Sequence, residues 1–356
     1  MKILVAADKF KGSLGSREAC AAIARGLHVA FPEAEIVQCP IADGGEGTME
    51  LISAILGAKV VEVGVTGPLG DPVTARYGVS GGRAIMEMSA ASGLLLVPED
   101  RRDPWVASTI GTGEMIGDAL RRGVEELIIG IGGSATNDGG RGMAEALGFR
   151  FSKDPVGGRL RISAPAVKPA ARARFQVACD VSNPLLGDRG CTRVYGPQKG
   201  VGAADFGAHE QRLAELAEAV HLDLAEVPVD TAGAGAAGGL GFGLMAFCGA
   251  ELRSGFDLVA SMSGLQAAID GADLIVTGEG GMDAQTLMGK GPAGVAGMAR
   301  SGGKRVVALC GVARDLEALS GRFDQVISLE SLINTREESM SRASELLEKS
   351  AAGVRI

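Results

Sequence analysis

The first segment that could do chemistry combines one carboxylate, two ammonium groups and a hydroxyl. These groups belong to Asp8, Lys9, Lys11 and Ser13. They follow an aliphatic run at 2–7 that predicts a strand, and they precede an amphipathic stretch at 16–31 that predicts a helix. Cations and a hydroxyl at a helix N-terminus can bind a carboxylate or phosphate, so we expect all four residues to contact a small anionic substrate. The alternative is a solvated loop in which Ser13 or Ser16 caps the helix.

Two carboxylates stand among three glycines in the next polar segment, Asp43-Gly44-Gly45-Glu46-Gly47-Thr48. Magnesium is a hard cation that prefers oxygen ligands, and carboxylates in such a loop can hold it. We expect Asp43 and Glu46 to be metal ligands. The alternative is a turn in which Asp43 caps the following helix and Glu46 is favoured by the helix dipole.

The densest glycine-rich segment is Gly130-Ile131-Gly132-Gly133-Ser134-Ala135-Thr136-Asn137-Asp138-Gly139-Gly140, after a predicted strand at 126–130. Successive backbone N–H groups can form an anion nest, to which hydroxyls add donors. We expect phosphate contacts from Gly132, Gly133, Ser134, Thr136 and Asn137. The spacing of Gly130, Gly132 and Ala135 also matches the dinucleotide fingerprint. The polar residues at 136–140 argue against that interpretation, because a dinucleotide-binding helix would bury an apolar face there.

A mixture of carboxylates, an amide, a hydroxyl and a lysine occupies residues 277–290, after a predicted strand at 274–277. Such a mixture suits a substrate or metal site better than a plain turn. We expect Glu279 and Asp283 to be further metal ligands. The expected substrate contacts are Gln285, Thr286 and Lys290. In the alternative, Thr286 or Asp283 merely caps the following helix.

An aspartate can align an acceptor hydroxyl and accept its proton in phosphoryl transfer. Asp180, after a predicted strand at 175–178, is the first choice for this role, and Asp138 is the second. Asn183 lies in the same loop as Asp180 and is expected to contact the substrate. Lys199 is expected to contact the phosphates, although lysines exposed on turns are common.

The bulk composition excludes several classes of protein. The 356 residues carry a net charge of −8, which argues against nucleic-acid and anionic-membrane partners. Six scattered cysteines indicate neither a zinc site nor a disulfide framework, and with no apolar run long enough for a membrane span they favour a cytoplasmic protein. The chain lacks the P-loop and protein-kinase motifs, and none of its three histidines lies in these loops.

Five strands joined by helices predict an α/β fold with a flavodoxin-like, doubly wound parallel sheet. The strands are expected near 2–7, 35–40, 274–277, 305–310 and 325–328. Between the second and third strands, residues 59–97 have the pattern of antiparallel hairpins, and residues 153–174 that of a surface excursion. We therefore expect residues 1–60 and 270–356 to form one discontinuous domain, interrupted by a second, mixed α/β domain at 61–269.

Taken in order, these segments resemble the glycerate kinases of the bacterial glycerate and glucarate pathways, of the glycerate 2-kinase type, over nearly the full chain. The resemblance rests on Asp8 to Leu14 (DKFKGSL), Ala42 to Thr48 (ADGGEGT), Gly132 to Gly142 (GGSATNDGGRG), Ala178 to Gly187 (ACDVSNPLLG), Tyr195 to Gly200 (YGPQKG), Gly235 to Gly241 (GAAGGLG) and Thr277 to Thr286 (TGEGGMDAQT). The chain departs at Lys9, where similar proteins read DSFKGS, and at Gly281, Met282 and Ala284, where they read TGEGRIDSQT.

The resemblance implies phosphorylation of D-glycerate by ATP with Mg²⁺, in a ligand cleft between two α/β domains. It implies 2-phosphoglycerate rather than 3-phosphoglycerate as the product. The partner expected is this small acid alone, with the protein a monomer or homodimer. Three alternatives stay open from the residues: a kinase for a related small acid, an NAD-dependent oxidoreductase for glycerate or hydroxypyruvate, and a non-catalytic metabolite sensor on a kinase scaffold.

Overall fold

The chain divides into two compact units. Unit 1 comprises Met1–Ile55 and Phe256–Ile356, and unit 2 comprises Leu56–Gly255. The chain therefore leaves unit 1 five residues before the position predicted, residue 60, and returns to it ahead of residue 270. The computed structural model describes residues 1–42, 47–224, 226–284, 286, 291–332 and 335–355.

Unit 1 is built on a five-stranded parallel sheet with the order β13-β12-β11-β1-β2. Its strands are β1 (Lys2–Ala7), β2 (Glu35–Gln38), β11 (Leu274–Met282), β12 (Arg305–Ala313) and β13 (Gln325–Ser328). The first strand of the chain lies between the second and the third, which is the flavodoxin-like order. The predicted doubly wound sheet is thus confirmed.

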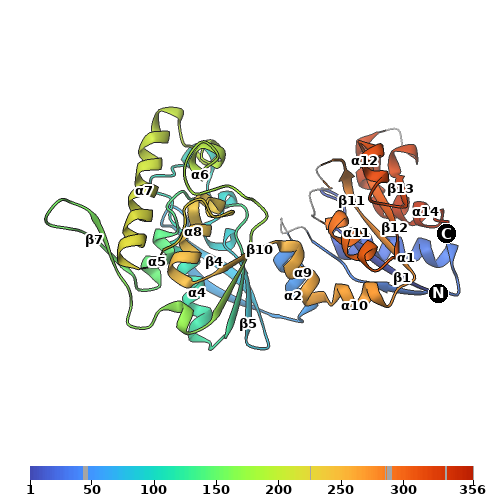
Figure 1. The fold of residues 1–356 in the computed structure, drawn as a ribbon, viewed down its shortest axis with the longest axis horizontal. Helices are drawn as coiled ribbons and strands as arrows, with labels where there is room; N and C mark the ends of the chain where they lie inside the picture. Colours follow the sequence, from blue (N-terminus) through green and yellow to red (C-terminus); the bar gives the residue numbers. More distant parts are fainter. Residues whose placement is uncertain (43–46, 225, 285, 287–290, 333–334, 356) are drawn as a thin grey trace. The chain divides into compact units, whose positions relative to one another are not determined.

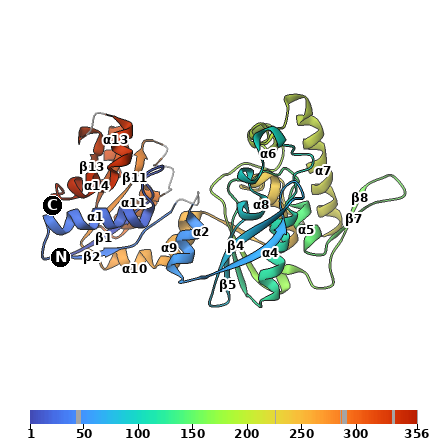
Figure 2. The same ribbon diagram turned by 180° about the vertical axis from the view of Figure 1, so that it is seen from behind.

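Alternate side chains of β1 enter two different cores. Ile3, Val5 and Ala7 pack with helices α1 and α14, whereas Leu4 and Ala6 pack with α9, α10, α11 and α12. These helices cover the two faces of the sheet (Figure 1 and Figure 2). Because both faces are covered, the strands read as continuous aliphatic runs. The helices of unit 1 are α1 (Ser16–Ala30), α2 (Thr48–Ile55), α9 (Gly255–Ser263), α10 (Leu265–Asp270), α11 (Gly291–Ser301), α12 (Leu316–Ser320), α13 (Arg336–Ser341) and α14 (Ala343–Ala351).

Unit 2 contains a mixed six-stranded sheet with the order β10-β9-β6-β5-β4-β3. Its strands are β3 (Lys59–Thr66), β4 (Pro72–Ser80), β5 (Arg83–Glu87), β6 (Glu126–Gly130), β9 (Arg174–Ala178) and β10 (Glu251–Arg253). The first three pair antiparallel, as their turn-rich sequence predicts, and β5, β6, β9 and β10 pair parallel. The loops that follow β5, β6 and β9 consequently leave the same edge of the sheet.

The helices of unit 2 cover this sheet and support its loops. They are α3 (Ser89–Ser92), α4 (Ile110–Arg121), α5 (Arg141–Ala146), α6 (Cys191–Tyr195), α7 (Phe206–Asp223) and α8 (Ala236–Cys248), with short 3₁₀ turns such as η1 (Leu94–Leu96) and η4 (Pro197–Lys199). A hairpin of β7 (Arg150–Lys153) and β8 (Leu160–Ser163) lies beside α7 (Figure 1); it begins three residues ahead of the surface excursion predicted at 153–174. Across the described ranges, no helix has the length and apolarity required to cross a membrane.

Candidate active-site loops

The switch point of the unit 1 sheet lies between β1 and β11. Their pairing sets Ala7 beside Gly278, and the N–H of Asp8 donates a 2.8 Å hydrogen bond to the carbonyl of Gly278. The loop after β1 and the end of β11 therefore start from the same point at the carboxyl edge. In doubly wound sheets this is where ligands bind.

Asp8 is buried at this edge, with 2% of its surface exposed. Its Oδ1 accepts a 2.6 Å hydrogen bond from the backbone N–H of Lys9. A Cβ placed on Gly291, the first residue of α11, would lie 3.2 Å from its Oδ2. The carboxylate therefore lies at the N-terminus of an 11-residue helix, an end that favours negative charge.

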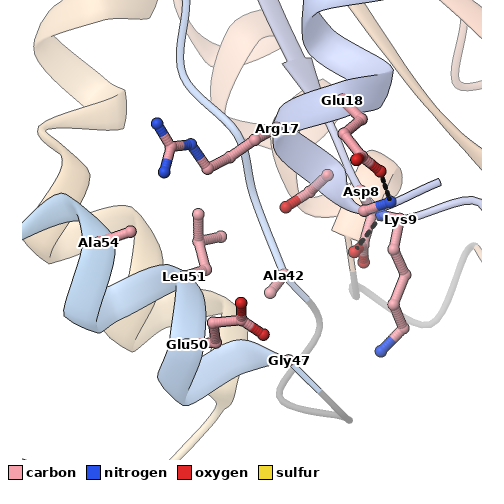
Figure 3. Close-up of a pocket in the computed structure, with 11 residues that line it drawn as sticks. Asp8, Lys9, Arg17, Glu18, Ala42, Gly47, Glu50, Leu51 and Ala54 are labelled. Carbon is pink, nitrogen blue, oxygen red and sulfur yellow. Dashed lines mark hydrogen bonds between the residues drawn. The ribbon is translucent and has the colours of Figure 1, made fainter. Parts of the chain in front are cut away.

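A pocket of about 430 Å³ opens beside Asp8, between the start of α1 and the side of α2 (Figure 3). Its charged lining residues are Asp8, Lys9, Arg17, Glu18 and Glu50. The two cations can pair with an anionic group, and the three carboxylates can accept hydrogen bonds from hydroxyl groups. The N-cap of α1 is Gly15, whose N–H donates to Oε2 of Glu18 at 3.0 Å, and not the Ser13 or Ser16 of the solvated-loop alternative.

The structure separates residues that the sequence grouped as one substrate site. Lys11 and Ser13 line a second pocket, of about 560 Å³, and Lys9 does not. A tight turn causes the separation: Phe10 and Leu14 exchange backbone hydrogen bonds, and the hydroxyl of Ser13 donates to the carbonyl of Phe10 at 2.9 Å. The same second pocket contains Gly281 and Arg314.

A hydroxyl links the carboxylate of Glu279 to the backbone of Asp283 in the fourth segment. Oγ1 of Thr286 donates to Oε1 of Glu279 at 2.9 Å and accepts from the backbone N–H of Asp283 at 3.2 Å. The backbone N–H of Thr286 donates to the carbonyl of Asp283 at 3.1 Å. Magnesium is commonly held by one or two carboxylates together with substrate phosphates and water, and this donor set fits that pattern.

Four of the expected site residues lie outside the described part of the chain. They are Asp43, Glu46, Gln285 and Lys290. Within the part that is described, no three His, Cys, Asp or Glu residues gather into a metal-binding cluster.

In unit 2, the glycine-rich loop after β6 is held against the loop after β5. The N–H of Leu94 donates to the carbonyl of Gly133 at 2.8 Å, and the N–H of Ala135 donates to the carbonyl of Ser92 at 3.0 Å. Helix α5 begins only at Arg141, so ten residues separate it from the end of β6. A dinucleotide-binding loop passes directly into its helix, so this geometry does not fit the fingerprint alternative.

Lys199 was expected to contact the phosphates, with a solvent-exposed turn as the alternative; the structure buries it, with 2% of its surface exposed. Its Nζ donates to Oγ of Ser134 at 2.6 Å and to the carbonyl of Thr136 at 2.7 Å. Burial lowers the pKa of Lys199 to about 8, while the Cys191 thiol and the Asp138 carboxylate act in the opposite direction. Lys199 is therefore packed against the loop after β6, on the side that solvent does not reach.

Two buried polar atoms of the same loop have no hydrogen-bond partner in the described part of the protein. They are Oγ1 of Thr136 and Oδ1 of Asn137. The other amide atom of Asn137, Nδ2, donates to Oγ1 of Thr192 at 3.0 Å. Turning this amide over would let its oxygen accept from Thr192 and would release its NH₂ group as a donor. Buried polar groups without hydrogen-bond partners reduce stability. Such groups are expected in a ligand-binding loop, where the bound ligand supplies the missing partners.

Asp138 is engaged in fixing the loop itself. Its Oδ2 accepts from the N–H and Oγ1 of Thr109, at 2.9 and 2.8 Å, and from the N–H of Gly142 at 3.2 Å. Its Oδ1 accepts from the N–H of Gly140 at 3.1 Å. A carboxylate with four such bonds, 4% exposed, is built to hold two segments together rather than to accept a substrate proton.

Glycines of the motif at 235–241 join the loop after β6 to the loop after β9. The N–H of Gly235 donates to the carbonyl of Asn183 at 2.9 Å, and the N–H of Gly139 donates to the carbonyl of Gly238 at 3.0 Å. A Cβ on Gly238 would collide with the carbonyl oxygen of Thr136. This close approach therefore needs a residue without a side chain.

The loop after β9 contains Asp180 and Asn183. Oδ1 of Asp180 accepts a 3.1 Å hydrogen bond from the N–H of Gly255, which orients its carboxylate. Both amide atoms of Asn183 are used within the loop: Oδ1 accepts from the hydroxyl of Tyr195 at 2.7 Å, and Nδ2 donates to the carbonyl of Arg189 at 2.8 Å. Asn183 thus shapes the loop that carries Asp180.

Two residues of these loops were not found from the sequence. Arg17, in the first turn of α1, lines the pocket beside Asp8, and a cation directly after the first polar segment was a signal that could have identified it. Thr109 anchors Asp138 from 29 residues away. No local pattern marks such a partner.

Comparisons with known proteins agree over almost the whole chain. The sequence profile described as "Glycerate kinase family" matches residues 3–355. The chain is 43% identical to a glycerate kinase of Bacillus subtilis (strain 168), covering 99% of this chain and 97% of that protein. It is 44% identical to a glycerate 2-kinase of Escherichia coli (strain K12), covering 96% and 94%. A crystal structure from Salmonella typhimurium LT2, assigned as a glycerate kinase 2, superposes with a TM-score of 0.87 at 42% identity, covering 99% of this chain and 96% of that one.

Proposed function

Because the chain belongs to the glycerate kinase family, we propose that it transfers the terminal phosphoryl group of ATP to D-glycerate and releases 2-phosphoglycerate. Membership makes the protein a phosphotransferase with an alcohol group as acceptor. The name of the E. coli relative supports the 2-phosphate product. The observation that carries the proposal is the glycine-rich loop after β6, where hydroxyl groups stand in front of a buried ammonium group.

We propose that this loop binds the phosphates of ATP. Backbone N–H groups at Gly132 and Gly133 and the side chains of Ser134, Thr136 and Asn137 supply the donors. A bound phosphate would accept from the hydroxyl of Thr136, and from the NH₂ group of Asn137 once its amide is turned over, so that both partnerless buried groups are satisfied. Phosphoryl transfer depends mainly on positioning and charge stabilisation, which such a loop supplies without moving.

Glycerate would be bound by residues of unit 1. The pocket beside Asp8 contains the ammonium of Lys9 and the guanidinium of Arg17, which can pair with the carboxylate of the acid. Carboxylates such as that of Glu50 can accept hydrogen bonds from its hydroxyl groups. Lys11 and Ser13, in the second pocket, would meet an anionic group there, and Arg314 adds a further cation.

Asp180 would align the reacting hydroxyl and accept its proton. Its backbone hydrogen bond with Gly255 fixes the carboxylate, which reduces the reorganisation needed during reaction. Asp138 is the weaker choice, because its oxygens already accept four hydrogen bonds.

Magnesium would be held by Glu279 and Asp283, which share Thr286, together with Asp43 and Glu46. Bound there, the ion would neutralise charge on the phosphates of ATP. Thr286 would orient the Glu279 carboxylate through its hydroxyl and Oδ1 of Asp283 through its backbone N–H. Gln285 and Lys290 remain proposed substrate contacts.

The product tests this proposal. The protein is incubated with ATP, Mg²⁺ and D-glycerate, and the phosphoester is observed by proton-coupled ³¹P NMR. A phosphate on carbon 2 has one proton three bonds away and gives a doublet, whereas a phosphate on carbon 3 has two and gives a triplet. A triplet would overturn the assigned product, and no ADP with a panel of hydroxy acids would overturn the kinase activity. NADH-dependent turnover without use of ATP would instead support the oxidoreductase alternative.

A second experiment tests the role of Asp180. Asp180→Asn should retain its fold and lose most of its turnover, because proton acceptance contributes roughly 10²- to 10⁴-fold to rate. Asp188→Asn is the matched control: it lies in the same loop with its side chain 96% exposed and should keep normal turnover. Near-normal turnover of a folded Asp180→Asn protein would refute the role.

A further inference from the structure

The ammonium group of Lys199 is buried, and no carboxylate among the described residues forms an ion pair with it. Both of its acceptors, the hydroxyl of Ser134 and the carbonyl of Thr136, are uncharged. Asp138 acts on it electrostatically but forms no ion pair with it, and its oxygens are engaged by Thr109, Gly140 and Gly142. A buried cation without a paired anion is costly, so the fold retains an unbalanced positive charge behind the loop.

The hydrogen bonds of Lys199 also determine the polarity of the loop. An ammonium group can only donate, so Oγ of Ser134 must accept from it, and the hydroxyl hydrogen of Ser134 is then directed elsewhere. No acceptor for that hydrogen is found among the residues with described positions. Oγ1 of Thr136 is buried and without a partner in the same set. The ammonium thus contacts the hydroxyl of one residue and the backbone of another whose own hydroxyl is unused, and a cation with two available O–H donors suits an anion rather than a metal ion.

We propose that Lys199 is a positioning residue that controls polyphosphate binding from behind the loop, through Ser134 and Thr136, and that the bound polyphosphate supplies its missing counter-charge. This inference rests on the proposed function of the loop and goes beyond it. It makes polyphosphate binding depend on protonation of Lys199, although the lysine does not contact the polyphosphate. It replaces the direct contact between Lys199 and phosphate that the sequence predicts.

Polyphosphate binding and protonation of Lys199 must affect each other reciprocally. If polyphosphate favours the charged lysine, then loss of the lysine proton must weaken polyphosphate binding by the same factor. Burial lowers the pKa of Lys199 to about 8, so its charge is present below that pH and is lost as the pH rises. The titratable groups that face it are the Asp138 carboxylate and the Cys191 thiol, and burial raises the pKa of that thiol to about 11. The thiol therefore stays neutral where the lysine titrates.

The experiment measures the dissociation constant of inorganic tripolyphosphate by calorimetry between pH 6.5 and 9.5, with the full chain and no metal. Tripolyphosphate gains negative charge as the pH rises, so any loss of affinity has to come from the protein. We expect the affinity to fall by up to about tenfold per pH unit above the pKa of the lysine, as loss of one proton requires. A constant or rising affinity would overturn the inference.

Variants separate charge from packing. Lys199→Met keeps an apolar chain of similar length and should bind tripolyphosphate at least tenfold more weakly, with no fall at high pH. Ser134→Ala should weaken binding but keep the pH dependence, because the charge remains. Lys153→Met, an exposed lysine of β7, is the control and should behave as the wild type. Wild-type affinity in a folded Lys199→Met protein would contradict the inference.

If Lys199→Met does not fold, NMR of the wild type decides the question. With ¹³C-labelled lysine, one side chain should titrate well below the others, and tripolyphosphate should raise its pKa. A lysine whose titration ignores tripolyphosphate would overturn the inference. This inference and the proposed activity can fail separately. If tripolyphosphate binding depends on pH but glycerate is not phosphorylated, the inference holds and the proposed activity fails. If glycerate is phosphorylated but binding does not depend on pH, the inference fails and the proposed activity holds.

Discussion

The hydroxyl of Thr286 donates a 2.9 Å hydrogen bond to Oε1 of Glu279, and the same oxygen accepts from the backbone N–H of Asp283. The side chain of Thr286 thus orients the carboxylate of Glu279 and holds the backbone at Asp283, while the N–H of Thr286 reaches Oδ1 of Asp283 at 3.4 Å. Groups that orient metal ligands in this way affect metal affinity almost as strongly as the ligands do.

Thr286→Val should therefore weaken the use of magnesium. Valine keeps the shape of threonine but cannot bond to Glu279, and we expect the Mg²⁺ concentration for half-maximal activity to rise about 10- to 100-fold. Thr286→Ser retains the hydroxyl and serves as the control. The measurement is initial rate against Mg²⁺ at saturating ATP and glycerate. If Thr286→Val left the Mg²⁺ requirement unchanged, Thr286 would only cap the turn and would not orient metal ligands.

Asp138→Ala should destabilise unit 2. The change leaves the donors of Thr109, Gly140 and Gly142 without their acceptor, and we expect the free energy of unfolding to fall by about 2 to 4 kcal/mol. Urea denaturation followed by circular dichroism measures this fall. If Asp138→Asn had normal stability and no turnover, Asp138 would instead be a catalytic residue.

Gly238→Ala should disrupt the contact between the loops after β6 and β9. Its φ is +68° and an added Cβ would collide with the carbonyl of Thr136, so we expect a loss of more than about 2 kcal/mol in stability. Ala237 also has a positive φ, of +55°, and Ala237→Gly should be neutral or stabilising by up to about 1 kcal/mol. Thermal unfolding compares the two variants. Equal melting temperatures would contradict the packing argument.

The hairpin of β7 and β8 should loosen in acid. The carboxylate of Asp223, at the end of α7, accepts from the N–H of Ile162 at 2.8 Å and pairs with Arg161 and Arg159. The N–H bond, with the arginines, lowers the pKa of Asp223 below its usual value. A carboxyl with a lowered pKa stabilises the fold above its unfolded pKa, and this contribution is lost as the pH falls through the folded one.

Hydrogen exchange at residues 150–163, measured between pH 7 and pH 3 and corrected for its intrinsic pH dependence, checks this prediction. Protection should fall with pH in the wild type. In Asp223→Asn it should be low already at pH 7 and should change little. A variant with the wild-type profile would show that the hairpin is held by other contacts.

The fold was largely predictable because its signals are local. The five strands of unit 1 are continuous aliphatic runs, and each is followed by polar or glycine-rich residues where a parallel strand ends. Hydrophobic periodicity and turn-forming residues therefore predicted the positions of the strands and of the loops at the carboxyl edge of the sheet. The succession of strands and helices predicted the strand order. The chain returns to unit 1 at Phe256, ahead of the expected residue 270, and no change in composition marks that point.

The partners of the site residues could not be predicted in the same way. Lys199 and Ser134 are 65 residues apart, and Asp138 and Thr109 are 29 apart. Such pairs form only when distant segments pack, and burial then decides whether a polar group faces a ligand or supports the loop.

The sequence by itself determined the α/β architecture, the glycine-rich loops and the family, because each is written in local pattern and motif order. Only the tertiary structure decided that Lys9 and Lys11 line different pockets, that Asp138 holds a loop, and that Lys199 is buried against the loop after β6 rather than exposed to solvent. The physical reason is that desolvation and hydrogen-bond satisfaction depend on what surrounds a side chain in space. The local amino-acid sequence does not specify those surroundings.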